Sequence, residues 1–160
     1  MQNKIKLISI NIIAGLFFTL TVYSSAYADP AKQSVVVKLD SFARGSWMQS
    51  ADEWHSVCMA LGLSNNLLDS KKKPNVTLFV NLEGVYLADS LEPLDNKQCG
   101  MANVDMMLKS FQSAGGKVLV CPGCAAIAGL TATDLREGAV MGTADSVEKL
   151  FLKADKVIDY

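Results

Sequence analysis

The stretch KVLVCPGC, residues 117–124, joins an apolar run to two cysteines. Its first half favours a buried strand, and Pro122 suits the first turn of a helix. If Cys121 is the N-cap of that helix, Cys124 falls at its third position, so both thiols face the helix N-terminus. Unpaired N–H groups at a helix N-terminus stabilise a thiolate and make a cysteine nucleophilic. The stretch therefore predicts a strand-to-helix junction that carries a reactive pair of thiols.

Strands and helices are expected to alternate on both sides of this junction. The apolar runs predict strands over residues 34–39, 76–82, 117–120, 139–141 and 156–159. The helical patterns predict a helix after an S-x-x-E capping box at residues 50–53, one over 104–114, one from the cysteine pair to Gly129, and one after 142–143. Strands that alternate with helices predict an α/β fold, a three-layer α/β/α domain with a mostly parallel sheet of about five strands.

Ligands of such a sheet gather outside the carboxyl ends of its strands. Four segments are expected to meet there, namely residues 40–45, 81–84, 121–124 and 142–143. Glu83 is a candidate for this edge, where it could accept a proton from a thiol, although a carboxylate that caps a turn is the alternative. Cys99 lies in the loop before the second predicted helix and could reach the same edge.

The N-terminus predicts an export signal. Two lysines precede an apolar stretch over residues 7–22, and the sequence Ala-Tyr-Ala at 26–28 predicts cleavage after Ala28. Residues 1–28 are then a cleaved signal peptide, and residues 29–160 are a single domain in the periplasm with no stable membrane anchor. Without the two signal lysines the net charge is −3 from 13 basic and 16 acidic residues. Nucleic acid is therefore not expected as a partner.

All four cysteines follow the predicted cleavage point, and an oxidising compartment allows disulfides. Four cysteines permit three full pairings, and the sequence does not choose among them. We expect Cys58 to be inert core on the apolar face of the first helix. Cys99 is either a partner thiol or a bystander. His55 lies off that apolar face and is expected to be solvated.

Several blocks resemble the DsrE/DsrF-like family. They are VTLFVNLEGV at 76–85, GGKVLVCPGC at 115–124, Gly129-Leu130 with Asp134-Leu135, and Ala154 to Val157 near the end. The resemblance implies a flavodoxin-like α/β domain, assembly as a homo-oligomer (trimer or hexamer), and sulfur relay through a persulfide on one cysteine. Cys121 matches the acceptor cysteine, and Gly129 matches the glycine eight residues after it. The chain departs from the relay members in three ways: it has Ile127-Ala128 where they tend to carry arginines, it adds Cys124, and its leader predicts export.

Three mechanisms remain open from the sequence. In the first, Cys121 accepts sulfur from a protein or small-molecule donor, and Cys124 is a possible resolving thiol. In the second, the pair cycles between dithiol and disulfide. In the third, the pair binds a soft metal together with Cys99, His55 or methionines. The leading hypothesis is sulfur handling by Cys121, Cys124 and Glu83, in the manner of a sulfurtransferase-like carrier, without a cofactor or a metal.

Overall fold

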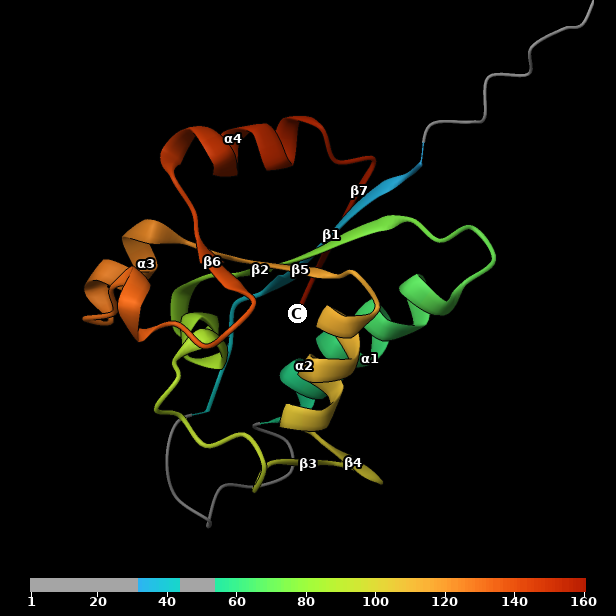
Figure 1. Ribbon diagram of the computed structural model, residues 1–160. Coiled ribbons are helices and arrows are strands. Elements are labelled where there is room, and N and C mark those ends of the chain that lie inside the picture. The colour runs from blue at the N-terminus through green and yellow to red at the C-terminus, as the bar shows by residue number, and fades with distance from the viewer. Residues whose placement is uncertain (1–31, 44–53) are drawn as a thin grey trace, which may run out of the picture. The chain divides into compact units, whose positions relative to one another are not determined.

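The computed structural model describes residues 32–43 and 54–160, and the elements below are those of these ranges (Figure 1). The strands are β1 Ser34–Leu39, β2 Asn75–Val80, β3 Gln98–Cys99, β4 Ala102–Asn103, β5 Lys117–Val120, β6 Ala139–Met141 and β7 Lys156–Asp159. The α-helices are α1 His55–Asp69, α2 Val104–Ser113, α3 Pro122–Ile127 and α4 Ala144–Leu152. Two 3-10 helices are η2 Leu82–Ala88 and η3 Ala132–Asp134.

The main sheet has five strands in the order β6-β5-β2-β1-β7, and every neighbouring pair in it is parallel. The run of valines in β1 explains why this strand lies inside the sheet. Val35, Val36 and Val37 are all buried, so both faces of the strand are covered. The α/β fold with a mostly parallel sheet of five strands is therefore confirmed. Because the strands are parallel, the carboxyl ends of all five lie at the same edge of the sheet.

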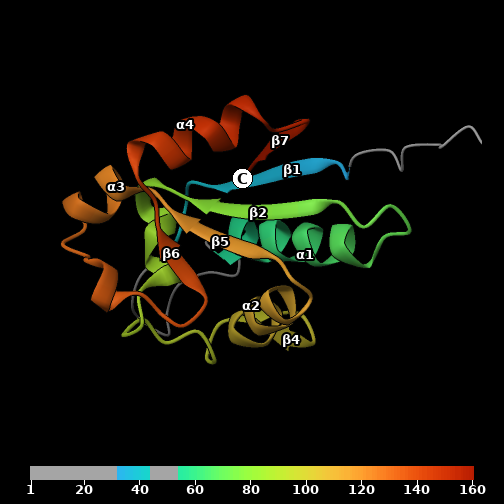
Figure 2. The same ribbon diagram turned by 45° about the horizontal axis from the view of Figure 1, so that its top comes forward.

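Helices cover the two faces unequally. Figure 2 shows α1 and α2 on one side of the sheet and α4 on the other. The main core lies on the α1 and α2 side, where Leu61 and Phe111 are fully buried. On the other side, the ring of Phe151 in α4 packs edge-on against Phe79, with 5.2 Å between the ring centres. These layers hold the carboxyl edge of the sheet in place.

The predicted start of the first helix is tested only in part. The capping box at residues 50–53 lies outside the described residues. Within them, α1 begins at His55 with Trp54 as its N-cap, and no side chain caps it.

The end of the second strand differs from the prediction. β2 ends at Val80, whereas the apolar pattern predicted a strand to Leu82. Leu82 instead has a φ of 45° and begins η2. The backbone N–H of Gly84 donates to the Asp40 carbonyl (3.1 Å), so η2 folds back against the end of β1. A Cβ on Gly84 would lie 2.1 Å from the Leu39 carbonyl oxygen, so this turn requires glycine.

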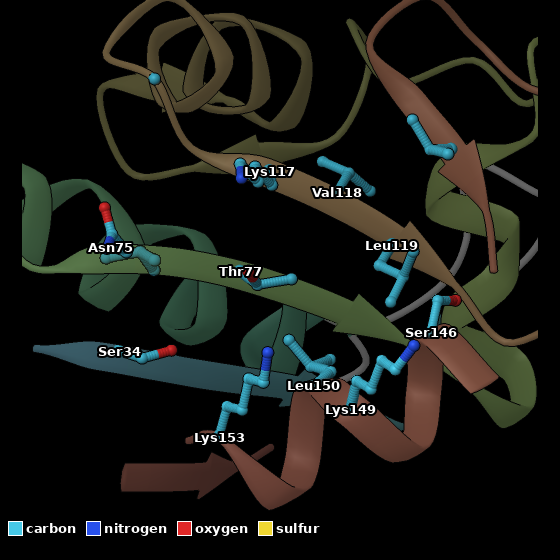
Figure 3. A pocket seen from close by; sticks show the side chains of 13 residues that line it. Ser34, Asn75, Thr77, Lys117, Val118, Leu119, Ser146, Lys149, Leu150 and Lys153 are labelled. Atoms are coloured by element: carbon cyan, nitrogen blue, oxygen red, sulfur yellow. The ribbon is translucent and has the colours of Figure 1, made fainter. Parts of the chain in front are cut away.

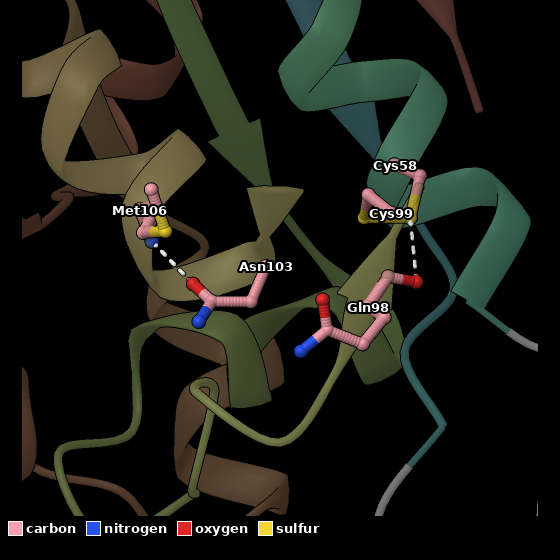
Figure 4. Close-up of a disulfide and its surroundings, with 5 residues drawn as sticks. All are labelled: Cys58, Gln98, Cys99, Asn103 and Met106. Atoms are coloured by element: carbon pink, nitrogen blue, oxygen red, sulfur yellow. Dashed lines mark hydrogen bonds between the residues drawn. A yellow bond between two sulfur atoms is a disulfide. The ribbon is translucent and has the colours of Figure 1, made fainter. Parts of the chain in front are cut away.

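The prediction that Cys58 is inert core is wrong. Cys58 in α1 forms a disulfide with Cys99 in β3, with 5.4 Å between their Cα atoms (Figure 4). The loop before α2 folds into a small antiparallel hairpin, β3–β4, which brings Cys99 to α1. Asn103 then caps α2 by accepting from the Met106 N–H at 2.8 Å. Cys99 is thus a partner thiol, but its partner is Cys58 and not the pair at the sheet edge.

Candidate functional site

Cys121 and Cys124 lie where the sequence predicted them, at the junction of β5 and α3. Cys121 is the N-cap of α3, and its sulfur accepts the Cys124 backbone N–H at 3.3 Å. Pro122 occupies the first turn, where its missing N–H leaves no hydrogen bond unmade. The Cys121 carbonyl accepts from the Ala125 N–H at 2.9 Å, which begins the helical ladder. The local sequence alone therefore places both thiols at one helix end.

The two sulfur atoms are in direct contact. Their separation is 2.6 Å, and both cysteines are free and half-buried. A disulfide bond is about 2.05 Å long, so closing the pair requires only a small further approach of the sulfurs. The geometry suits either a hydrogen bond between a thiol and a thiolate or the formation of a disulfide.

The surroundings of Cys124 favour its protonated form. Burial, and then the hydrogen bond with Cys121, raise the pKa of the Cys124 thiol, while the backbone N–H of Leu82 acts in the opposite direction. Cys124 therefore keeps its proton and can donate it toward the Cys121 sulfur. That sulfur also accepts the Cys124 backbone N–H, so two donor groups of Cys124 converge on the Cys121 sulfur.

Beside Cys124 a small cavity opens between η2 and α3. Its volume is about 200 Å³, and it is lined by Leu82, Glu83, Tyr86, Cys124, Ile127 and Ala128. The structure thus brings Glu83 and Cys124 to the same cavity. Leu82 belongs to segment 81–84, which was predicted at this edge, although within that segment only Glu83 was a candidate site residue. Tyr86 was not predicted. Tyr86 lies three residues after Glu83, and a 3-10 helix places side chains at that spacing on the same face. The sequence pattern did not predict a 3-10 helix here, so this spacing gave no signal.

The remaining predicted edge residues have structural roles. The Gly142 N–H donates to the Val120 carbonyl at 2.9 Å, and a Cβ on Gly142 would lie equally close to that oxygen. This glycine lets β6 and α4 pass close behind the cysteine pair. The Asp40 carboxylate pairs with Lys38 at 3.0 Å and does not line the cavity. The rest of segment 40–45 lies partly outside the described residues.

The structure does not assemble the predicted soft-metal ligands. Cys99 is bonded to Cys58, and His55 is exposed at the start of α1, as expected for a solvated histidine. Among residues 32–43 and 54–160, no group of three or more His, Cys, Asp or Glu side chains is placed to hold a metal ion.

A larger cavity, of about 550 Å³, lies elsewhere, between α4 and the sheet (Figure 3). Lys117, Lys149 and Lys153 stand around it, and Thr77 and Leu119 form part of its floor. No residue of the cysteine pair or of α3 lines it. This larger cavity is therefore separate from the thiols.

No helix in the described part of the chain is long and apolar enough to span a bilayer. No curated protein matches this sequence. Among solved structures, the chain is similar to the YchN protein from E. coli, with a TM-score of 0.61 and 20% identity over 81% of this chain and 99% of that one. It is also similar to MTH1491, a protein of unknown function from Methanobacterium thermoautotrophicum, with a TM-score of 0.59 and 13% identity over 81% of this chain and 100% of that one.

These two likenesses confirm the fold. The family itself is shown by the sequence, because the family model described as DsrE/DsrF-like matches residues 49–160, which include η2, the cysteine pair and the cavity beside it. The chain belongs to the DsrE/DsrF-like family.

Proposed function

We propose that this protein handles sulfur in the periplasm, with Cys121 as the persulfide acceptor and Cys124 as the resolving thiol. The observation that carries the proposal is the contact of two free thiols, 2.6 Å apart, at a helix N-terminus on the carboxyl edge of a parallel sheet. Membership of the DsrE/DsrF-like family, whose members include sulfur-relay proteins, supports it. The partner is a sulfur donor or acceptor, either a protein or a small sulfur species.

The chemistry needs two displacements. The Cys121 thiolate attacks the outer sulfur of a donor persulfide, RS–SH, so that the S–S bond of the donor breaks and Cys121–S–SH forms. The donor leaves as a thiolate and takes up a proton. The Cys124 thiolate then attacks the Cys121 sulfur, which forms the Cys121–Cys124 disulfide and releases hydrosulfide. Passing the outer sulfur to an acceptor thiol instead returns the pair to its starting state.

The proposed location rests on two observations. The apolar leader that ends in Ala-Tyr-Ala is typical of an exported protein. The Cys58–Cys99 disulfide supports the same location, because structural disulfides persist mainly in oxidising compartments. The family resemblance supports a homo-oligomer as the functional form.

Mass spectrometry tests the proposal. The protein is purified from the periplasm of an expressing bacterium, its exposed thiols are reduced under mild conditions, and it is incubated with inorganic polysulfide. We expect a one-sulfur adduct on Cys121 that accumulates in Cys124→Ser, because the resolving thiol is absent there. Cys121→Ser should give no adduct. Absence of the adduct from both the wild-type protein and Cys124→Ser would refute sulfur carriage.

The close contact of the sulfurs also favours a second function, dithiol–disulfide exchange. That reaction requires both cysteines, whereas sulfur acceptance requires only Cys121. If Cys124→Ser shows no adduct and the wild-type pair exchanges readily with disulfides, the redox function takes the place of the first proposal.

A further inference from the structure

The cavity beside Cys124 is lined by exposed apolar side chains and one charged side chain. Two large apolar side chains remain exposed at it, Leu82 at 56% and Ile127 at 91% of their surface. Glu83 is the one charged residue among the side chains that line it. An apolar surface with a single charge is typical of a site for a small ligand that carries the opposite charge.

The backbone at this cavity is held in a conformation that side chains rarely adopt. Leu82 has a φ of 45°, in the left-handed region, although it is not glycine. The Leu82 N–H faces the Cys124 thiol and lowers its pKa, and the Leu82 side chain lines the cavity. Backbone conformations of this kind cluster at sites of function, where the surrounding structure maintains them. The strain is thus located where a ligand would meet the thiol pair.

The size of the cavity limits the ligand. Pockets that bind drug-sized molecules measure roughly 300 to 1,000 Å³, and this cavity measures about 200 Å³. It can receive a group of a few non-hydrogen atoms attached to sulfur. A folded partner could cover the cavity but could not enter it.

The charge of the cavity limits the ligand further. The Glu83 carboxylate attracts an ammonium group and repels carboxylates and inorganic polysulfide anions. Because Glu83 is exposed, this preference is modest in size.

We propose that this cavity receives the organic group of a small aminothiol donor, a persulfide or disulfide with an ammonium group close to its sulfur, and that Cys124 gives its proton to the thiolate that leaves. The proposal rests on the function proposed above and names its substrate class. Cys121 attacks the outer sulfur of RS–SH, the S–S bond breaks, and RS⁻ departs into the cavity and takes the Cys124 proton. Cys124, now a thiolate, attacks the Cys121 sulfur, so that two thiols are oxidised to a disulfide and the donor is reduced to RSH and hydrosulfide.

Three disulfides of similar size and different charge test the charge preference. They are cystamine, which carries ammonium groups, bis(2-hydroxyethyl) disulfide, which is neutral, and 3,3′-dithiodipropionate, which carries carboxylates. The rate at which each disulfide oxidises the Cys121–Cys124 pair is divided by the rate at which the same disulfide reacts with the free thiol N-acetylcysteine amide. This division corrects for the different reactivity of the leaving thiols. We expect the corrected rate to fall about threefold at each step from cation to neutral to anion, as for an exposed charge pair.

Two substitutions at the cavity and one control make the test specific. Glu83→Gln should make the corrected rates for the three disulfides nearly equal. Ile127→Lys, at a highly exposed position, should shift the preference toward the anion. Glu148→Gln removes an exposed carboxylate from α4 that does not line the cavity, and it should leave the order unchanged.

The outcomes of these experiments distinguish a failure of this inference from a failure of the proposed sulfur-handling function. If Glu83→Gln keeps the full preference for cystamine, or if Glu148→Gln abolishes it, the cavity does not select the donor and the inference is overturned. The polysulfide adduct on Cys121 can still form in that case, so sulfur handling survives. If the preference is present but no adduct forms with polysulfide, the pair is a redox site for aminothiol disulfides and the proposed sulfur carriage fails.

Discussion

The Cys58–Cys99 disulfide should supply a large part of the stability of this domain. It closes a loop with a sequence separation of 41 residues between α1 and β3. The loss of chain entropy that such a cross-link imposes on the unfolded state corresponds to about 4 kcal/mol at 25 °C. Because single domains are stable by only about 5 to 15 kcal/mol, the double substitution Cys58→Ala/Cys99→Ala should leave a marginal protein.

Urea unfolding of the protein with its disulfide formed measures this difference. With a slope of about 2 kcal/mol per molar urea, the unfolding midpoint of the double variant should fall by about 2 M. Cys121→Ala/Cys124→Ala is the matched control, since it also removes two cysteines, but these are free. It should lose only about 1 kcal/mol, the contribution of an N-cap. A loss below about 1 kcal/mol for Cys58→Ala/Cys99→Ala would refute the reasoning, because the cross-link would then restrict the unfolded chain very little.

Two further predictions concern the edge of the sheet. Gly84→Ala places a Cβ 2.1 Å from the Leu39 carbonyl oxygen, so η2 must move away from β1, and thermal unfolding should show a loss of about 3 kcal/mol or more. Unchanged stability would mean that η2 is not held against β1. Alkylation of Cys124 should rise with pH later than that of a free cysteine, because burial and the hydrogen bond with Cys121 raise the pKa of Cys124 and the reactive thiolate forms only above that pKa. In Cys121→Ala the hydrogen bond is absent, and the rise should move to lower pH; a rise at the same or higher pH would contradict the assigned contact.

Most of the sheet could be predicted because its strands are short apolar runs between turn residues. The runs over 34–39, 117–120, 139–141 and 156–159 match the observed strands at both ends. In β1, burial on both faces leaves little place for polar residues, so the limits of this strand are visible in the sequence. β6 and β7 are short edge strands without a buried residue, and turn residues mark their limits instead. The cysteine pair was predictable because its geometry depends only on neighbouring residues. Cys121 as the N-cap, Pro122 at the first helical position and Cys124 at the third all lie within one turn of helix.

The features that escaped prediction depend on contacts between distant segments. The apolar pattern continues through Leu82, and only the return of η2 onto the end of β1 reverses the backbone at that residue. The cavity beside Cys124 lies at this reversal, so Tyr86 carried no local signal as a site residue, and Leu82 was predicted at the edge only as a member of segment 81–84. Pairing of Cys58 with Cys99 likewise depends on the β3–β4 hairpin, and the two-residue strands of that hairpin are too short for a periodic pattern.

The cysteines divide into two pairs with different dependence on the fold. Cys58 and Cys99 meet only when α1 and the hairpin have packed, so their bond reports a completed tertiary structure. Cys121 and Cys124 are three residues apart and meet through one turn of helix, so they can change redox state without reordering the sheet. Neither Cys58 nor Cys99 lines the cavity beside Cys124, and a ligand in that cavity meets only the free pair. The function proposed above, in an oxidising compartment, requires this separation, because disulfide exchange between the two pairs would break the Cys58–Cys99 bond that stabilises the fold.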